Sequence, residues 1–464
     1  MKFTPTKYQL MNVLDGHLFS DCGWTLADPD SPSMSLVRAV YKKKKFSPRE
    51  DLEGIYRYSE WLPVSRVLKK SCAPVTYKSK GLAKHLGLEN LYITFSGYNP
   101  KIGAKMETCS FKETEAFSVC GRLPKDSDQV LVVQSAGNTA RAFAQVCSDN
   151  NIPIVICVPA DNYHDLWFRK KLNSCVKMLA TPAGSDYYDA IVLGDKICQS
   201  PRFFAEGGAK NVARRDGMGT TLLSAVEVIG RIPDAYFQAV GSGTGAIAVW
   251  ENNLRLIEDG RFGSHKMKLF VSQNSPFTLI YDSWKAHSRE LVSLTPEQSR
   301  RDAEVILAKV LSNRKPPYSI QGGLFDALED TGGDVFKVCN DDIVRWMLMY
   351  RNLEGYDIFP AAATAVASLS QAVENGQVRK DEVIMLNITG GGSLAAQSRG
   401  YYVKEPDLII DPELPAEEII SMVEALFDNQ PGLFGVKKEA RQEARKEARA
   451  KRVALRKPAC KAKK

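Results

Sequence analysis

Short apolar strands alternate with helical segments along most of the chain, and this alternation constrains the fold more than any other feature. Apolar, mostly β-branched stretches end in polar or glycine-containing loops, and segments of helical periodicity, such as 139–150 and 186–199, lie between them. This order is typical of βαβ units and parallel sheets, whose sites lie at the carboxyl ends of the strands. The expected strands are 129–135, 152–159, 177–180, 235–241, 268–272 and 383–389.

The composition is that of an ordinary globular protein, with 44% hydrophobic and 25% charged residues among 464. This length suggests two or three domains. No apolar run approaches the roughly 18 residues that a membrane span needs, and the first residues lack the apolar core of a secretory signal. Ten scattered cysteines without a Cys-x-x-Cys pair predict a reducing, cytoplasmic location and no metal site.

The net charge of +8 is concentrated at one end of the chain. Thirteen of the 62 Lys and Arg, but only three of the 54 Asp and Glu, lie in residues 437–464, so the rest carries 49 basic and 51 acidic residues. We expect this Ala/Glu/Arg-rich tail to be disordered or a frayed helix, because like charges recur four residues apart. Polyanion binding through the tail is an alternative function of a different class. The near-neutral remainder argues against nucleic acid as the main partner.

Lys112 is the first candidate catalytic residue, in the run Thr108-Cys-Ser-Phe-Lys-Glu. It follows an irregular segment rich in Gly and Pro and begins an expected helix. Apolar and small neighbours would desolvate its amine and favour the neutral form, which condenses with an aldehyde. Taken alone, the residue is better explained as a surface lysine on an amphipathic helix.

Ser135–Thr139 forms a second candidate site between an expected strand and helix. Hydroxyls, a glycine and a helix N-terminus can together cradle a carboxylate, and Asn138 can face a phenolic oxygen of a cofactor. Taken alone, the segment is equally well explained as an ordinary helix N-cap with turn residues. The predicted substrate-binding residues are Ser135, Ala136, Gly137, Thr139 and Arg214, the last of these from the resemblance described below.

Val240–Ala246 places three glycines within five residues at a third strand–helix junction. Successive backbone N–H groups in such a loop hold a phosphate. The segment also matches the dinucleotide pattern G-x-G-x-x-A, but that interpretation requires an acidic residue at the end of the next strand, which here ends at Gln273. A single phosphate therefore fits better. The predicted phosphate-binding residues are Gly241, Ser242, Gly243, Thr244 and Gly245.

Thr389 ends a fourth strand and is followed by three glycines, which on their own would indicate only a tight turn. The four junctions together decide the interpretation. A lysine, an anion cradle, a phosphate loop and a hydroxyl-bearing strand end follow one another in this order. This combination predicts an enzyme that binds pyridoxal 5′-phosphate (PLP) through Lys112.

The same residues resemble the fold-type II PLP enzymes, and within them the threonine synthase branch. The resemblance covers about residues 50–400 and includes the pieces Ser110-Phe-Lys, Ser135–Thr139, Gly241–Gly245, Asp357–Ala365 and Thr389–Gly392. It implies an α/β, tryptophan synthase β-like fold of two doubly wound parallel-sheet domains, with Thr389 at the pyridine nitrogen and a homo-oligomer. The implied division is an N-terminal extension, 1–50; a catalytic region, 51–435, with a smaller mobile subdomain near 125–230; and a tail, 436–464.

Departures from the threonine synthase pattern change the expected substrate. Glu113–Glu115 stands where those enzymes have Asp-Arg-Gly, Gly219 replaces a lysine, and their N-terminal cysteines are reduced to Cys22, although Arg214 is retained. In these details the chain is similar to the cysteate synthase family, whose β-replacement turns O-phospho-L-serine and sulfite into L-cysteate and phosphate for coenzyme M biosynthesis. Threonine synthase and O-phosphoserine sulfhydrylase activities remain alternatives. The candidate residues for binding these anions are Lys105, Arg141, Arg214 and Arg215.

Overall fold

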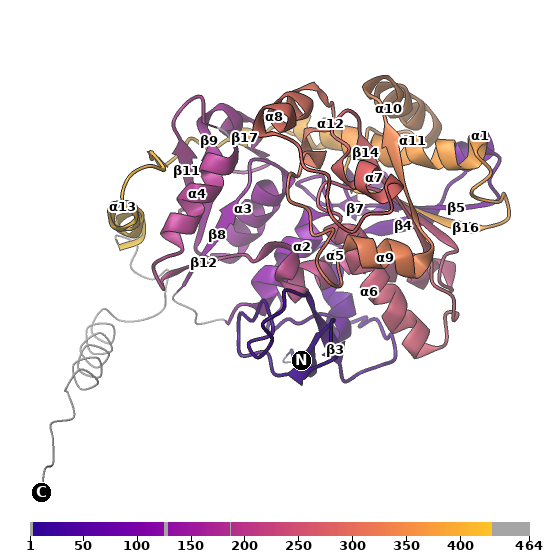
Figure 1. Ribbon diagram of the computed structural model, residues 1–464, viewed down its shortest axis with the longest axis horizontal. Coiled ribbons are helices and arrows are strands. Elements are labelled where there is room, and N and C mark those ends of the chain that lie inside the picture. The colour runs from indigo at the N-terminus through magenta and orange to yellow at the C-terminus, as the bar shows by residue number, and fades with distance from the viewer. Residues whose placement is uncertain (1–2, 125–128, 186, 429–464) are drawn as a thin grey trace, which may run out of the picture.

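Two β-sheets, each covered by helices on both faces, form the frame of the molecule (Figure 1). The computed structural model describes residues 3–124, 129–185 and 187–428. The lobe with the smaller sheet lies at the left of Figure 1, and the lobe with the larger sheet lies at the right. The predicted tail, 436–464, falls outside the described residues, and the predicted domain boundaries stay a prediction.

The larger sheet has six strands in the order β15-β14-β13-β16-β5-β4. All neighbours are parallel except β4, which pairs antiparallel with β5 at one edge, so the sheet is mixed rather than purely parallel as expected. Its strands are β4 (Val75–Lys78), β5 (Asn90–Phe95), β13 (Ala235–Ala239), β14 (Lys268–Asn274), β15 (Asp334–Val338) and β16 (Val383–Ile388).

Side chains that alternate along these strands bury both faces of the larger sheet, because successive residues of a strand point to opposite sides. Tyr236 and Met385 pack into the core on one face, and Phe237 and Leu386 into the core on the other. The first face is covered by α5 (Val212–Ile229), α6 (Thr244–Asp259), α7 (Leu279–Lys285) and α9 (Leu324–Thr331). The second is covered by α1 (Gly81–Leu86), α10 (Asn340–Glu354) and α11 (Pro360–Glu374).

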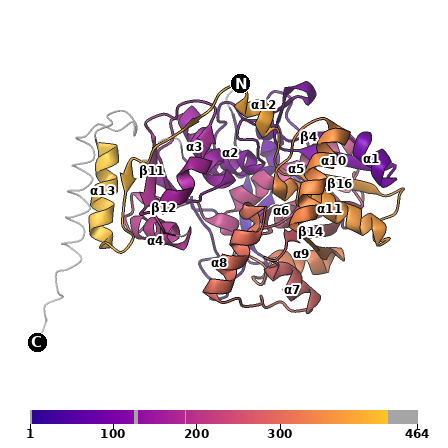
Figure 2. The ribbon, with the colours of Figure 1, turned by 90° about the horizontal axis from the view of Figure 1, so that it is seen from above.

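The smaller sheet is parallel throughout, in the order β12-β8-β9-β11-β18. Its strands are β8 (Val130–Gln134), β9 (Ile154–Pro159), β11 (Val176–Thr181), β12 (Phe203–Ala205) and β18 (Leu408–Ile409). One face packs on α2 (Lys112–Arg122) and α3 (Asn138–Asn150), the other on α4 (Tyr187–Ile197) and α13 (Ala416–Asp428). The last segment of the described chain thus returns to this lobe, where α13 lies beside α4 (Figure 2).

The remaining short elements connect the lobes or lie at their surface. Two-residue strands form a β6–β7 hairpin and a β10–β17 ribbon, the latter joining the smaller lobe to the returning chain. These elements are β6 (Tyr98–Asn99), β7 (Ala104–Lys105), β10 (Trp167–Phe168), β17 (Tyr402–Val403), α8 (Pro296–Val305) and α12 (Ser393–Gln397).

All six strands expected from the sequence are present, and the expected helices correspond to α3 and α4. The sequence analysis did not anticipate β5, β12 and β15. Among the described residues, no helix is both long and apolar enough to cross a membrane.

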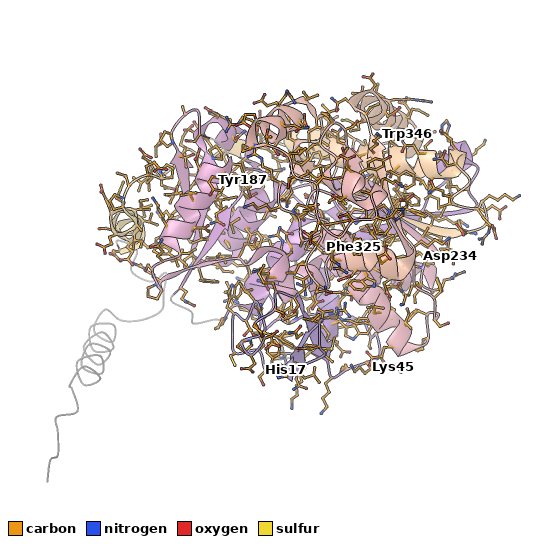
Figure 3. The ribbon with its side chains drawn as sticks, viewed as in Figure 1. His17, Lys45, Tyr187, Asp234, Phe325 and Trp346 are labelled. Carbon is orange, nitrogen blue, oxygen red and sulfur yellow. The ribbon has the colours of Figure 1, made fainter. Side chains whose placement is uncertain are left out.

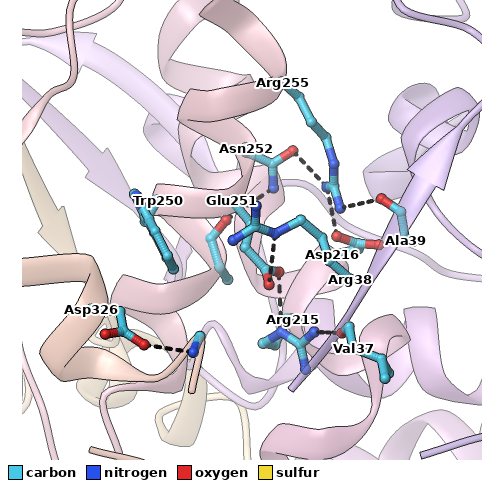
Figure 4. Close-up of polar contacts among 12 residues, drawn as sticks. Val37, Arg38, Ala39, Arg215, Asp216, Trp250, Glu251, Asn252, Arg255 and Asp326 are labelled. Carbon is cyan, nitrogen blue, oxygen red and sulfur yellow. Dashed lines mark hydrogen bonds and ion pairs between the residues drawn. The ribbon is translucent and has the colours of Figure 1, made fainter. Parts of the chain in front are cut away.

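The N-terminal residues form a third, antiparallel sheet with the order β2-β1-β3, made of β1 (Tyr8–Asn12), β2 (Leu18–Phe19) and β3 (Val37–Tyr41). A buried ionic network attaches it to α5 and α6 (Figure 4). The Glu251 carboxylate on α6 accepts hydrogen bonds from Arg215 Nε at 3.0 Å and Arg38 Nε at 3.4 Å. Asp216 accepts one from Arg255 at 2.6 Å and another from the Tyr41 hydroxyl at 2.5 Å. The sheet is therefore bound to the catalytic region through charges that water does not screen.

Candidate active site

Two of the four predicted junctions lie side by side at the carboxyl edge of the larger sheet. Strands β13 and β16 are parallel neighbours, so the loop Gly241–Gly245 after β13 and Thr389 after β16 emerge at the same edge. This is the place where ligands bind in open α/β sheets.

Lys112 is brought to that edge by backbone hydrogen bonds. Ser110 forms an isolated bridge with Gly390, and the Phe111 N–H donates to the Thr389 carbonyl at 2.9 Å. Lys112 follows as the first residue of α2. The segment before α11 closes the other side of the glycine turn, where Ile358 bridges Gly391. The sequence motifs around Lys112 and Thr389, 277 positions apart, thus form one structural unit.

The fourth junction, Ser135–Thr139, comes from the smaller sheet and approaches the loop Gly241–Gly245 through Val310. Helices α2 and α3 pack together, and Arg141 in the first turn of α3 is close enough to Glu113 in the first turn of α2 to influence its pKa. The short helix Lys309–Leu311 lies against both loops. A Cβ placed on Gly137 would lie 3.7 Å from Val310 Cγ1, and one on Gly241 would lie 2.8 Å from the Val310 carbonyl oxygen.

The Lys112 amine lies in a small buried cluster of charges. Its Nζ is 3.0 Å from Oε2 of Glu115, and Arg214 Nε is 3.2 Å from the same oxygen. Arg214 also forms an ion pair with Glu206. Burial, and then the nearby Arg214, lower the pKa of Lys112, while Glu115 acts in the opposite direction. The net effect favours the neutral amine, which is the nucleophilic form.

The glycine loop has the shape of a phosphate cradle. Gly243 has φ of +76°, a left-handed conformation that favours glycine, and it immediately precedes α6. Side chains at Gly243 and Gly245 would meet Leu324 Cδ2 at 2.6 Å and the Gln238 amide at 2.8 Å. The first N–H groups of α6 have no partner within the helix and carry its positive dipole end. The loop therefore leaves backbone, rather than side chains, to face an anion.

Three further residues belong to the site that the sequence analysis did not single out. Ser96 is fully buried beside Thr389, its N–H donating to the Ile388 carbonyl at 3.0 Å, and its hydroxyl has no partner. Glu115 Oε1 and Glu206 Oε2 are likewise buried without a partner. Ser96 and Glu206 directly follow β5 and β12, so recognising the run Leu91–Phe95 as a strand would have indicated the first. Unpaired buried polar atoms around Lys112 are what a polar cofactor requires, and the site fits PLP.

The four basic residues that the sequence analysis proposed for anion binding differ in burial and in ion pairing. Arg215 is fully buried and ion-paired with Glu251, so it is unavailable to a substrate. Arg214 lies in the site, but Glu115 and Glu206 already balance its charge, and its role toward the substrate stays a prediction. Lys105 is exposed on β7, whereas Arg141 is buried.

Gly219, which replaces a lysine of threonine synthases, faces α6 rather than solvent. A Cβ there would lie 1.8 Å from Asn252 Nδ2, so the space for a side chain is filled.

Tyr187, labelled in Figure 3, lies on the smaller lobe at the start of α4, where its hydroxyl donates to the Gln134 carbonyl at 2.7 Å. The roles of Ser135, Ala136, Thr139, Asn138, Ser242 and Thr244 toward ligands also stay predictions.

Comparisons with known proteins agree with this geometry. A family model described as "Pyridoxal-phosphate dependent enzyme" matches residues 73–390. A cysteate synthase from Methanoculleus marisnigri is 48% identical over 408 residues, covering 87% of this chain and 93% of that protein. The chain belongs to the cysteate synthase family of PLP-dependent enzymes. A second cysteate synthase, from Methanocella paludicola, is 45% identical over 393 residues, 84% of this chain and 92% of its own.

Solved structures confirm the predicted fold class of this cysteate synthase family member. Serine racemase from Dictyostelium discoideum matches with a TM-score of 0.51 and 17% identity, covering 68% of this chain and 92% of that chain. Threonine deaminase isoform 2 from Solanum lycopersicum matches with a TM-score of 0.50 and 16% identity, covering 70% and 88%. The family also confirms PLP as the cofactor.

Proposed function

We propose that the protein converts O-phospho-L-serine and sulfite into L-cysteate and phosphate. The observation that supports it is the partly buried Lys112 amine, which is held at the edge where the glycine loop and Thr389 meet and is paired with Glu115. The identity to cysteate synthases over most of the chain supports this reaction rather than threonine synthesis or sulfhydrylation.

The residues present can hold PLP at each of its polar groups. Lys112 would bind its aldehyde carbon, Gly241–Gly245 its phosphate, Asn138 its phenolic oxygen and Thr389 its ring nitrogen. Bound PLP supplies an electron sink that allows a proton to leave Cα and a leaving group to depart from Cβ. A neutral threonine hydroxyl does not hold the ring nitrogen protonated as a carboxylate would, which suits elimination over a persistent carbanion.

Lys112 moves the proton in this scheme. Its neutral amine removes the Cα proton, and the C–O bond to phosphate breaks with the electron pair leaving on oxygen. Sulfite forms the new C–S bond, and Lys112 returns a proton to Cα. Glu115 Oε2, 3.0 Å from Nζ, stabilises the amine while it carries that proton. The atoms balance without any further reactant.

Replacing Glu115 with glutamine is expected to shift the reactivity of Lys112 to lower pH. Without the carboxylate, burial and Arg214 lower the pKa of the amine further, because the opposite charge that raised it is gone. The rate at which the apoprotein takes up PLP should then stay high down to a lower pH than in the wild type. The kcat should fall about tenfold or more. Glu206→Gln, which removes the other partner of Arg214, is the matched control and should shift the profile less. An unchanged profile in Glu115→Gln would contradict this role.

Product analysis tests the proposed function itself. The purified holoenzyme should release phosphate and form cysteate from O-phospho-L-serine and sulfite, identified by mass spectrometry. Sulfide as acceptor and O-phosphohomoserine as donor should each give at least about tenfold lower kcat/KM, corresponding to about 1.4 kcal/mol of discrimination. Faster cysteine or threonine formation would replace the proposal by one of the two alternatives.

We further propose a cytoplasmic homo-oligomer. The nine cysteines among the described residues are all free, as expected where thiols stay reduced. The proposed substrates, O-phospho-L-serine and sulfite, are small polar metabolites, which supports a role in intermediary metabolism inside the cell.

A further inference from the structure

Arg141 is a buried cation without a counter-ion. The residue is only 4% exposed, and its Nη2 has no hydrogen-bond partner. Its Nε donates to the Trp167 carbonyl at 3.0 Å, and its Nη1 to Asn138 Oδ1 at 3.4 Å. In the part of the chain that the structure describes, no carboxylate forms an ion pair with it. An unpaired buried charge is costly, so its presence indicates a ligand that supplies the missing negative charge.

The guanidinium lies beside the catalytic lysine segment and the start of α3. It reaches back to Asn138, the first residue of that helix, and one of its faces is covered by the Trp167 ring at 3.7 Å from guanidinium carbon to ring centroid. Burial lowers the pKa of Arg141 to about 10, and the next largest influences are Cys109 and Glu113, on the segment that carries Lys112. The Arg141 guanidinium and the N-terminus of α3 thus lie together, close to Cys109 and Glu113, which flank Lys112 in the chain.

Glu113 does not neutralise this charge. Its Oε1 accepts hydrogen bonds from the N–H and hydroxyl of Thr108 at 2.6 and 2.8 Å. Burial raises the pKa of Glu113 to about 7, so the carboxyl is partly protonated near neutral pH. Of the four cations considered from the sequence, Arg141 is the one that is both buried and without a carboxylate partner.

We propose that Arg141 binds the oxyanion at the reacting β-carbon, first the phosphate of the substrate and then the sulfite that replaces it. This inference rests on the proposed function and names the residue that selects an anionic acceptor. Arginine presents its donors as a planar fork that matches two oxygens of a phosphate or sulfite. The α-carboxylate of the substrate would instead bind the neutral donors of Ser135–Thr139.

Arg141→Met in the holoenzyme tests the proposal. Methionine keeps the contact with Trp167 but removes the buried charge and its hydrogen bonds to the Trp167 carbonyl and Asn138, so sulfite kinetics are compared on variant protein that retains PLP. The KM for sulfite should rise about 10- to 100-fold, the usual effect of losing a charge-assisted hydrogen bond, and Arg141→Lys should give an intermediate value. Lys170→Met, which removes an exposed charge three residues after Trp167, should change this KM less than about twofold.

L-Alanine separates the β-oxyanion from the α-carboxylate, because it carries only the latter. Its inhibition constant should be nearly unchanged in Arg141→Met. The proposal would be overturned if the inhibition constant of L-alanine rose as much as the KM for sulfite. It would also be overturned if the KM for sulfite were unchanged in a variant that retains PLP.

Sulfate distinguishes failure of this inference from failure of the proposed function. Sulfate should raise the thermal midpoint of the wild-type holoenzyme and raise it much less in Arg141→Met, whatever the acceptor of the reaction. If cysteate is not formed but this difference is seen, the anion site stands and the proposed reaction fails. If cysteate is formed and the two proteins respond equally to sulfate, the assignment of Arg141 fails alone.

Discussion

Lys112→Ala is expected to abolish covalent PLP binding and to lower kcat by at least about 10³-fold, because one residue both holds the cofactor and moves the Cα proton. The protein should still fold. Glu115 keeps Arg214 as a partner at 3.2 Å, so removing the amine does not leave the carboxylate isolated. The visible absorbance of lysine-bound PLP measures the first effect, and cysteate formation measures the second.

Two further variants make the Lys112 experiment specific. Lys105→Ala removes an exposed lysine seven positions earlier and should retain both absorbance and activity. Lys112→Arg keeps a positive charge beside Glu115 but cannot form the covalent bond, so it should behave like the alanine variant. A Lys112→Ala protein with intact absorbance would show that another residue carries the cofactor.

Glu251→Ala is expected to lower the free energy of unfolding by about 3–5 kcal/mol, the usual cost of removing one partner of a buried ion pair. The substitution leaves Arg215 and Arg38 without the carboxylate between them. Glu258→Ala is the matched control on the same helix. Its pair with Lys44 is exposed, so its loss should cost less than about 1 kcal/mol. Denaturant unfolding of both holoenzymes gives the comparison, and equal small losses would contradict a structural role for the network.

The same network predicts a pH dependence. Burial alone would raise the pKa of Glu251, but Arg215, Arg38 and Arg255 outweigh it and the pKa is lowered. A carboxyl with a lower pKa in the folded state contributes stability above its unfolded pKa, about 4.3, and loses that contribution as the pH falls through the folded value. The wild type should therefore lose more stability than Glu251→Ala on acidification below about pH 4.3.

The sequence was sufficient to predict the cofactor because the chemistry of the candidate site is local. Three of the four junctions combine a strand end with small residues, Lys112 begins an expected helix after an irregular segment, and none of these features depends on distant contacts. Residues defined by distant contacts were not predictable in this way. Glu206 reaches the site only through Arg214, and Ser96 is recognised as unpaired only once β16 lies beside β5.

The arginines illustrate the same limit. Arg214 and Arg215 are adjacent in the sequence and equally basic, but on a helix they point in different directions, one to Glu115 and the other to Glu251. Nor does the sequence distinguish a paired guanidinium from the unpaired one of Arg141. Only the three-dimensional arrangement of carboxylates decides between them.

The late return of the chain to the smaller lobe has a consequence for biosynthesis. Strand β11 borders β9 on one side, and β18 covers its other side only when residues 408–409 have left the ribosome. Throughout translation of the larger lobe, the nascent chain therefore exposes a hydrogen-bonding strand edge, the kind of surface that recruits other strands or a chaperone. A chain truncated before residue 408 would leave that edge permanently open, so closure of the smaller lobe depends on residues far along the chain from Lys112.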